Sequence, residues 1–172
     1  MDAVELLTHQ HRALEDLFNR LIEAGDDPER RRALFASTAD QLSVHIAAEE
    51  QLFYPAVVAC RTEDVLLESL EEHLSLKRLL ADLLEMDPSE RTFEPKLKVL
   101  REQAEHHHGE EEEDLFPKVR KMLDPGRLQA LGEQMLALQK DLRQEGAPRE
   151  VVAEQTEAAA PLAPAGDKPG QA

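Results

Sequence analysis

The sequence has no tryptophan and only one cysteine, Cys60, among its 172 residues. A single cysteine excludes an internal disulfide framework and any zinc site built from several cysteines, and it fits a reducing compartment. No apolar run approaches the roughly 20 residues of a membrane helix, and the N-terminus lacks the basic start and apolar stretch of a secretory signal. We therefore expect a cytoplasmic protein with no membrane partner, in which Cys60 has a packing role.

Basic and aromatic residues are also scarce. Lysine and arginine number 20 against 36 acidic residues, which gives a formal net charge of −16. Such a field repels phosphate backbones, so nucleic acid is not an expected partner. The apolar residues are mostly leucine and alanine, and the charged ones are mostly glutamate and arginine, a mixture that favours helices. No feature identifies a protein partner.

Apolar side chains recur at spacings of three and four residues in stretches separated by helix breakers, which predicts an all-α fold. The five predicted helices span residues 3–24, 29–59, 65–85, 94–122 and 127–144. We expect a bend or a stop at Pro55, since proline removes a helical N–H, and Pro117 falls similarly late in the fourth stretch. Residues 147–172 lack large apolar side chains, which predicts a disordered tail. The expected organisation is a bundle over 1–124, an additional helix over 125–146 and this tail.

The part before residue 124 contains two copies of one helical hairpin. A shift of 62 positions places His11 on His73, His45 on His107, Glu49 on Glu111, Glu50 on Glu112 and Pro55 on Pro117. Apolar positions follow the same shift. Two such hairpins form an antiparallel four-helix bundle.

The repeat preserves ionisable residues where a bundle needs a core. His45 and Glu49 are four residues apart, so they differ by roughly 40° in direction and share one side of a helix. His11 and His73 lie on the apolar stripes of their helices. An unpaired imidazole or carboxylate there would cost several kcal/mol, which metal coordination would remove. The sequence therefore predicts a metal centre with the ligands His11, His45, Glu49, His73, His107 and Glu111.

The ligand set favours two ions, because six protein ligands with two carboxylates able to bridge are sufficient for a dinuclear centre inside a bundle. Imidazole and carboxylate without thiolate suit iron, manganese, zinc or copper. Iron is our first choice because such ligation with open positions is what dioxygen or redox chemistry requires. Zinc or manganese remains an alternative.

The other histidines fall outside the repeat, and we predict a peripheral position for His9, His106 and His108. Glu15 follows His11 by four residues, but Lys77 occupies its place in the second hairpin, so it is only an outside candidate ligand.

Glu50 and Glu112 adjoin proposed ligands and match in the repeat, so they are candidate outer partners or alternative ligands. Tyr54 is expected to pack, with a hydrogen bond toward the centre as the other option.

Two motifs carry a family resemblance: His45-Ile-Ala-Ala-Glu49-Glu-Gln-Leu-Phe-Tyr-Pro55 and His107-His-Gly-Glu-Glu111-Glu-Glu-Asp-Leu-Phe-Pro117. With His11 and Glu72-His73, they resemble the hemerythrin-like HHE cation-binding domain over about residues 4–123. The resemblance implies an up-down-up-down four-helix bundle with a non-haem di-iron centre, in proteins that bind or sense dioxygen, nitric oxide, or iron and redox state.

Two departures from the family pattern argue against simple oxygen transport. Oxygen-carrying hemerythrins have a second histidine one turn after the ligand on the third helix, where this chain has Lys77. Their last helix supplies an aspartate where this chain has Glu112.

Three functions follow from these residues. The first is a di-iron binding protein that handles dioxygen, nitric oxide, peroxide or iron in a sensing, storage or protective role. The second is a di-iron peroxidase or oxygenase, although no separate acid, base or substrate pocket is evident in the sequence. The third is a regulatory module, stabilised by zinc or free of metal, that signals through the fifth helix and the tail.

Overall fold

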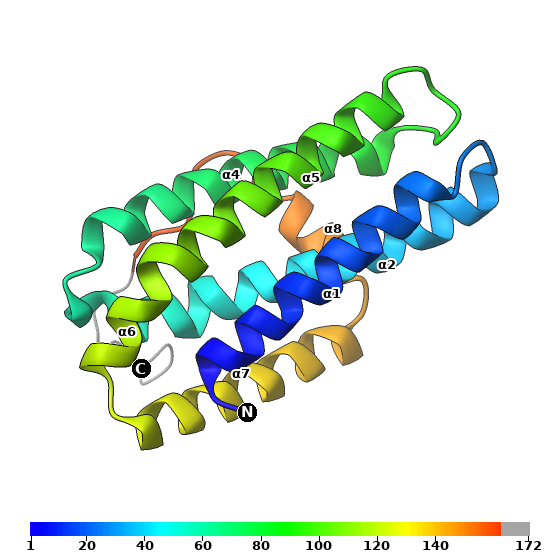
Figure 1. Cartoon of the computed structure of the whole chain (residues 1–172). Coiled ribbons are helices and arrows are strands. Elements are labelled where there is room, and N and C mark those ends of the chain that lie inside the picture. The colour runs from blue at the N-terminus through cyan, green and yellow to red at the C-terminus, as the bar shows by residue number, and fades with distance from the viewer. Residues whose placement is uncertain (163–172) are drawn as a thin grey trace.

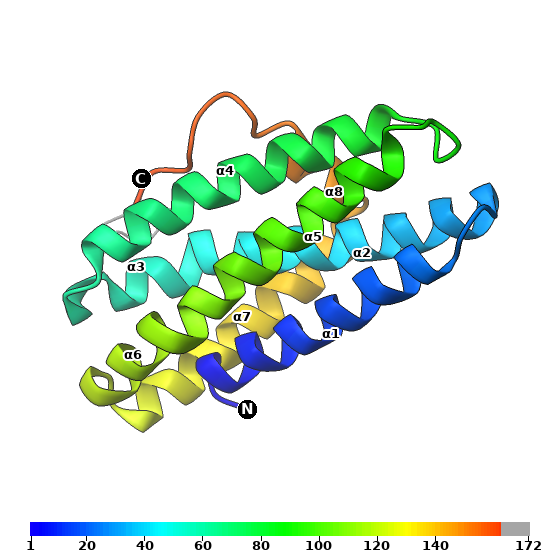
Figure 2. The ribbon, with the colours of Figure 1, turned by 45° about the horizontal axis from the view of Figure 1, so that its top comes forward.

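A computed structural model describes residues 1–162, and every regular element within them is a helix. Four long helices lie alongside one another, as Figures 1 and 2 show. They are α1 (Ala3–Glu23), α2 (Pro28–Ala48), α4 (Glu63–Glu85) and α5 (Phe93–Glu110). The remaining α-helices are α3 (Tyr54–Val57), α6 (Phe116–Met122), α7 (Pro125–Glu145) and α8 (Pro148–Ala153). The all-α class and the five predicted helical stretches are confirmed, and no helix within 1–162 is long and apolar enough to span a membrane.

Aspartates define the starts of three helices. Asp2 and Glu5 form a reciprocal capping box at α1, in which each side chain accepts the other residue's backbone N–H. Asp27 and Asp124 accept backbone N–H groups at the starts of α2 and α7, and a proline follows each of them. These side chains satisfy N–H groups that have no partner within the helix, and they complement the positive end of its dipole.

Pro55 and Pro117 do not stop their helices. In each hairpin a π-helical turn precedes the proline, η1 (Glu49–Phe53) after α2 and η3 (Glu111–Leu115) after α5. The backbone N–H of Tyr54 donates to the carbonyl of Glu49 across five residues, and the second hairpin repeats this bond. A π turn contains one more residue than an α-helical turn, so it changes the directions of the side chains around it. Such turns are frequent at functional sites. The expected bend is thus a widened turn at the glutamate that follows each histidine by four residues.

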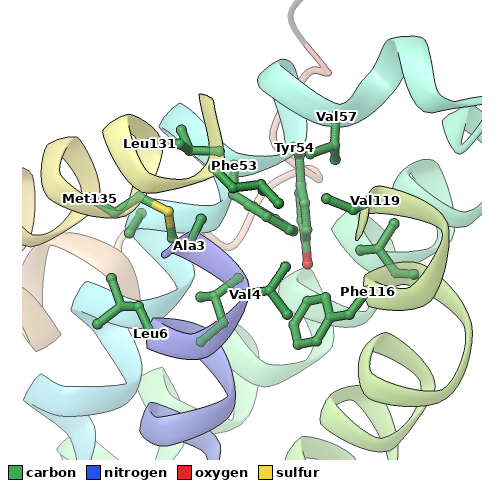
Figure 3. Close-up of a cluster of buried hydrophobic side chains, with 14 of the residues drawn as sticks. Ala3, Val4, Leu6, Phe53, Tyr54, Val57, Phe116, Val119, Leu131 and Met135 are labelled. Atoms are coloured by element: carbon green, nitrogen blue, oxygen red, sulfur yellow. The ribbon is translucent and has the colours of Figure 1, made fainter. Parts of the chain in front are cut away.

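The apolar core is divided into two clusters. On α1, Leu7 belongs to one cluster and Leu14 to the other, and His11 lies between them. Figure 3 shows the first cluster, where Phe53 and Tyr54 pack with side chains of α1, α6 and α7. A layer of buried polar residues therefore crosses the bundle between two water-excluding clusters.

The fifth helix packs on the first hairpin, where α7 contacts both α1 and α2. Gly132 makes this approach possible, because a Cβ there would lie 2.6 Å from the backbone oxygen of Met1. A side chain at this position would separate α7 from the start of α1.

The expectation of a disordered tail is wrong for much of the segment that the structure describes. Helix α8 packs against α2 and α4 with Val152 buried, and Arg78 of α4 donates to the backbone oxygen of Thr156. This segment needs few apolar residues of its own, since the long helices supply the surface on which it orders. Residues 163–172 of the predicted tail lie outside the described residues.

Candidate metal centre

The six predicted ligands converge in the polar layer, and each is at most 2% exposed. One histidine comes from the middle of α1 and one from the middle of α4. The other two come from the last turns of α2 and α5. The glutamates are the first residues of the two π turns. Each hairpin thus contributes two imidazoles and one carboxylate.

Two groups of potential ligand atoms share one glutamate. One group is His11, His45, Glu49 and Glu111, and the other is Glu49, His73 and His107. Glu49 places one oxygen 3.2 Å from His45 Nε2 and the other 3.1 Å from His73 Nε2. Glu111 belongs to the first group, and its Oε1 lies 2.7 Å from His107 Nε2. Both glutamates therefore face the imidazoles of both hairpins.

The outer nitrogen of every imidazole is held by an oxygen. The Nδ1 atoms of His11, His45, His73 and His107 lie 2.8, 2.9, 3.0 and 3.1 Å from Glu112, Gln10, Glu50 and Glu72, respectively. Donation from Nδ1 leaves each Nε2 as a lone pair directed inward, the arrangement typical of metal-ligating histidines. The partners obey the repeat, because the shift of 62 places Gln10 on Glu72 as well as Glu50 on Glu112. The sequence suggested Glu50 and Glu112 as outer partners, but the other pair was missed because amide and carboxylate differ in chemistry.

Most of the unpaired buried polar atoms lie in this layer. Within residues 1–162, nine buried side-chain atoms lack a hydrogen-bond partner. Six of them are His11 Nε2, His45 Nε2, His108 Nε2, Glu49 Oε1 and both carboxylate oxygens of Glu111. Three of the six still face an ionisable neighbour, since His45 Nε2 lies 3.2 Å from Glu49 Oε1 and Glu111 Oε1 lies 2.7 Å from His107 Nε2. Leaving such atoms unpaired is costly, and inward lone pairs of nitrogen and oxygen are what a transition-metal ion accepts. The donor set therefore fits a cation.

The pKa values of the two buried glutamates are shifted in opposite directions. Burial raises the pKa of Glu49, yet His45 and His73 outweigh it and hold that pKa well below its ordinary value. Burial and the charge of Glu49 raise the pKa of Glu111 to about 7. Burial also lowers the pKa of His11 to about 2, so its imidazole is neutral. Burial lowers the pKa values of His73 and His107, but the facing carboxylates outweigh it and raise both. A cation between the carboxylates would take over the stabilising role of these imidazolium charges.

Tyr54 is both a packing residue and a polar one. Its ring stacks on His73, and its hydroxyl lies 3.2 Å from His73 Nε2 and 3.4 Å from His107 Nε2. The repeat places Phe116 at the equivalent position in the second hairpin. The hydroxyl therefore makes the second pair of imidazoles different from the first.

Only two of the three unmatched histidines are peripheral. His9 and His106 are exposed, as predicted. The prediction for His108 is wrong, because it is 6% exposed and its ring stacks on His11 with centroids 4.0 Å apart. Helix α5 contacts α1 as well as α4, so adjacent residues of α5 can both face the interior. The four-residue spacing from the buried Ala104 is the sequence signal that could have located His108.

The other candidates lie around the cluster. Glu15 is exposed at the edge of a pocket of about 280 Å³ between α1 and α5, which reaches His11 and His108. Lys77 is 1% exposed and lies 2.9 Å from the carboxylate of Glu50. Lys77 thus neutralises an outer partner.

The additional helix also reaches the centre. Gln139 of α7 is 1% exposed and exchanges two hydrogen bonds with Gln10, the residue that orients His45. The fifth helix is therefore linked to the cluster through one buried amide pair.

Comparisons with known proteins agree with this geometry. The family model of the hemerythrin HHE cation binding domain matches residues 2–119, which include all six predicted ligands. Uncharacterized proteins of Mycobacterium bovis and Mycobacterium tuberculosis are 30% identical over 144 residues, or 83% of this chain and 88% of theirs. The crystal structure of a hemerythrin HHE cation binding domain-containing protein from Mycobacterium kansasii aligns with a TM-score of 0.74 at 28% identity, covering 87% of this chain and 98% of that one.

A DNA nickase of Nostoc sp. is also similar, at 25% identity over 144 residues. The match covers 84% of this chain, but the chain spans only 41% of the nickase.

Proposed function

The chain belongs to the hemerythrin HHE cation-binding family, and on that premise we propose that its core binds a pair of iron ions. The proposed ligands are His11, His45, Glu49, His73, His107 and Glu111. The observation that carries the proposal is the convergence of unpaired nitrogen and oxygen atoms on one buried layer. Two pairs of imidazoles with two glutamates between them supply enough donors for two ions. Iron suits this thiolate-free set, and zinc or manganese is the alternative.

The proposed role is to bind or sense dioxygen, nitric oxide or peroxide, or to handle iron. Bound iron would supply the redox chemistry. The chain itself buries the donors, fixes each ring through an outer acceptor and excludes water with apolar clusters on both sides. The pocket between α1 and α5 supports this role, because it gives a small molecule a way to the ring of His11.

The same proposal covers the architecture. Residues 1–124 would be an up-down-up-down four-helix bundle, since the short connections 24–27 and 86–92 favour antiparallel neighbours. Residues 125–146 would be an additional helix that supports His45 through Gln139. We retain the cytoplasmic location as a proposal that rests on the single cysteine.

Anaerobic iron loading tests the proposal. We expect about two equivalents of iron per chain, as a dinuclear site requires. We also expect a visible absorption change on exposure to air, peroxide or nitric oxide, reversed by a reductant. Uptake of fewer than two equivalents after loading would contradict the dinuclear centre.

A pair of double variants separates metal binding from the metal-free module. His45→Ala with His107→Ala should lose the metal and lower the melting temperature of the loaded protein, because metal binding is linked to folding. His9→Ala with His106→Ala removes two exposed imidazoles instead and should change neither quantity. An unchanged melting temperature and an unchanged metal content in the first variant would instead favour the regulatory module, which does not depend on these ligands.

The pocket also keeps an enzyme in consideration. It is lined by charged side chains, among them Arg12 and Glu15, beside the proposed ligand His11. A peroxidase or oxygenase needs such access for its substrate. Steady-state consumption of peroxide by the iron-loaded protein, at many turnovers per centre, would select this alternative over sensing or storage.

A further inference from the structure

His108 is the buried histidine that the repeat does not explain. Its counterpart in the first hairpin is Ile46. The His108 ring lies parallel to that of His11, with an interplanar angle of 10°, and meets the edge of His45 at a centroid distance of 5.1 Å. It therefore belongs to the same side of the polar layer as the two histidines of the first hairpin.

The nitrogen atoms of this trio lie close together, and a rotation of the stacked His108 ring would direct its lone pair toward the ion at His11 and His45. One nitrogen from each of His11, His45 and His108 lies within 4.8 Å of the other two. The Nε2 atoms of His11 and His108 are buried without a hydrogen-bond partner among residues 1–162, and His45 Nε2 faces Glu49 Oε1 at 3.2 Å. A histidine kept only for packing normally directs its buried polar atom to a hydrogen-bond partner. His108 instead buries its Nε2 beside those of His11 and His45 without such a partner.

The side of the layer at His73 and His107 has no third imidazole among residues 1–162. The Tyr54 hydroxyl contacts both His73 and His107, and Lys77 pairs with Glu50 behind His73. The two sides of the layer therefore carry different numbers of imidazoles, three and two.

We propose that His108 is a seventh protein ligand, which gives the ion at His11 and His45 three imidazoles while the ion at His73 and His107 has two. This inference rests on the proposed function, since it assigns a further residue to the same centre.

Chelator competition on the metal-loaded protein tests the assignment. In His108→Ala, one of the two ions should be lost at a chelator concentration at least about tenfold lower than in the unmodified chain, because a direct ligand matters no less than an outer partner. Imidazole added in solution should restore that affinity, since the pocket beside His108 holds about 280 Å³. His106→Ala, which removes the exposed neighbour, should release both ions as the unmodified chain does.

His108→Phe separates coordination from packing. Phenylalanine retains a flat ring against His11 but has no nitrogen, so metal affinity should fall as it does in the alanine variant. Metal release from both His108 variants at the same chelator concentration as the unmodified chain would overturn the proposal. Weak binding in alanine that phenylalanine restores would also overturn it, since His108 would then act by packing.

A measurement on the unmodified chain covers the case in which the variants do not fold. In the zinc-loaded protein, side-chain ¹⁵N spectra should contain five metal-bound imidazoles, with His108 among them. Four metal-bound imidazoles without His108 would overturn the assignment. If the unmodified chain holds only one ion, the dinuclear proposal is contradicted. The spectrum would still show whether His108 binds that ion, and so would test the His108 proposal independently.

Discussion

His45 and His107 occupy equivalent places in the two hairpins, but the groups that orient them differ. His45 faces the neutral amide of Gln10, which is buried against Gln139 of α7. His107 faces the carboxylate of Glu72, whose side chain is 24% exposed. A carboxylate behind an imidazole makes it a more basic ligand than an amide does. The duplication therefore preserved the hydrogen bond while the electron-donating strength of the two sides diverged.

The same divergence extends to the surroundings of the two sides. The side of the layer at His11 and His45 also contains His108 of α5 and is covered by α7. The side at His73 and His107 contains the Tyr54 hydroxyl and the ion pair of Lys77 with Glu50. The two sides of the layer therefore surround their ligand atoms with different charged and polar groups. We expect the two ions of the proposed centre to differ in affinity.

The largest effect is expected from a change at Glu49, the carboxylate that the two halves share. Glu49 faces imidazoles of both hairpins, so Glu49→Gln should abolish binding of the second equivalent of metal and weaken the first. The loaded protein should also lose several kcal/mol of unfolding free energy, because metal binding energy is folding energy here. Metal analysis after gel filtration and thermal melts measure both quantities. Glu113→Gln, an exposed change in the neighbouring π turn, is the control, and equal losses in both variants would rule out a specific role for Glu49.

The next effect concerns one half alone. Glu72→Gln gives His107 the kind of amide partner that His45 has, and we expect one ion to bind about 10- to 100-fold more weakly. Glu71→Gln changes the exposed neighbour and should have no effect. Isothermal titration of the metal-free protein with zinc would measure both steps. A loss shared equally by the two steps would mean that the halves are not independent.

Metal binding should also depend on pH in a defined direction. Burial and Glu49 raise the pKa of Glu111 to about 7, so the metal-free protein carries a proton there at lower pH. Binding displaces that proton, and the apparent affinity should fall at least about tenfold per pH unit below this pKa, since His73 and His107, whose pKa values are also raised, must lose protons too.

Zinc titrations between about pH 5.5 and pH 8 measure this slope. Glu111→Gln removes the titrating group, so its binding, although weaker, should vary less with pH. An equal slope in both proteins would assign the proton to another group.

The smallest effect tests the link to the fifth helix. Gln139→Ala leaves Gln10 in place but removes its two hydrogen bonds to α7. Each such bond is worth about 1 kcal/mol, so we expect a few-fold loss of affinity for the ion at His45 and a small decrease in melting temperature. Gln134→Ala, on the same helix but outside this contact, is the control. A loss at the His107 ion instead would show that α7 acts on the other half.

Most residues of the proposed centre could be predicted because they recur at the same positions in both copies of the hairpin. The six ligand positions recur with identical spacing, and the structure brings all six together. Glu50 and Glu112 recur in the same way, and each orients a histidine of the opposite hairpin. Gln10 could also have been found from its match with Glu72.

The sequence alone therefore determined the features that depend on residue spacing: the helices, the hairpin repeat and the polar layer within them. Tertiary structure decided the rest. His108 is buried because α5 contacts two neighbouring helices, and its exposure cannot be deduced from the stripe of a single helix. Helix α8 packs on α2 and α4, and Thr156 accepts a hydrogen bond from Arg78 of α4, although the composition of this segment is too poor in large apolar side chains to predict it. Both depend on surfaces that exist only after the helices have packed, because burial belongs to the assembled bundle and not to the local chain.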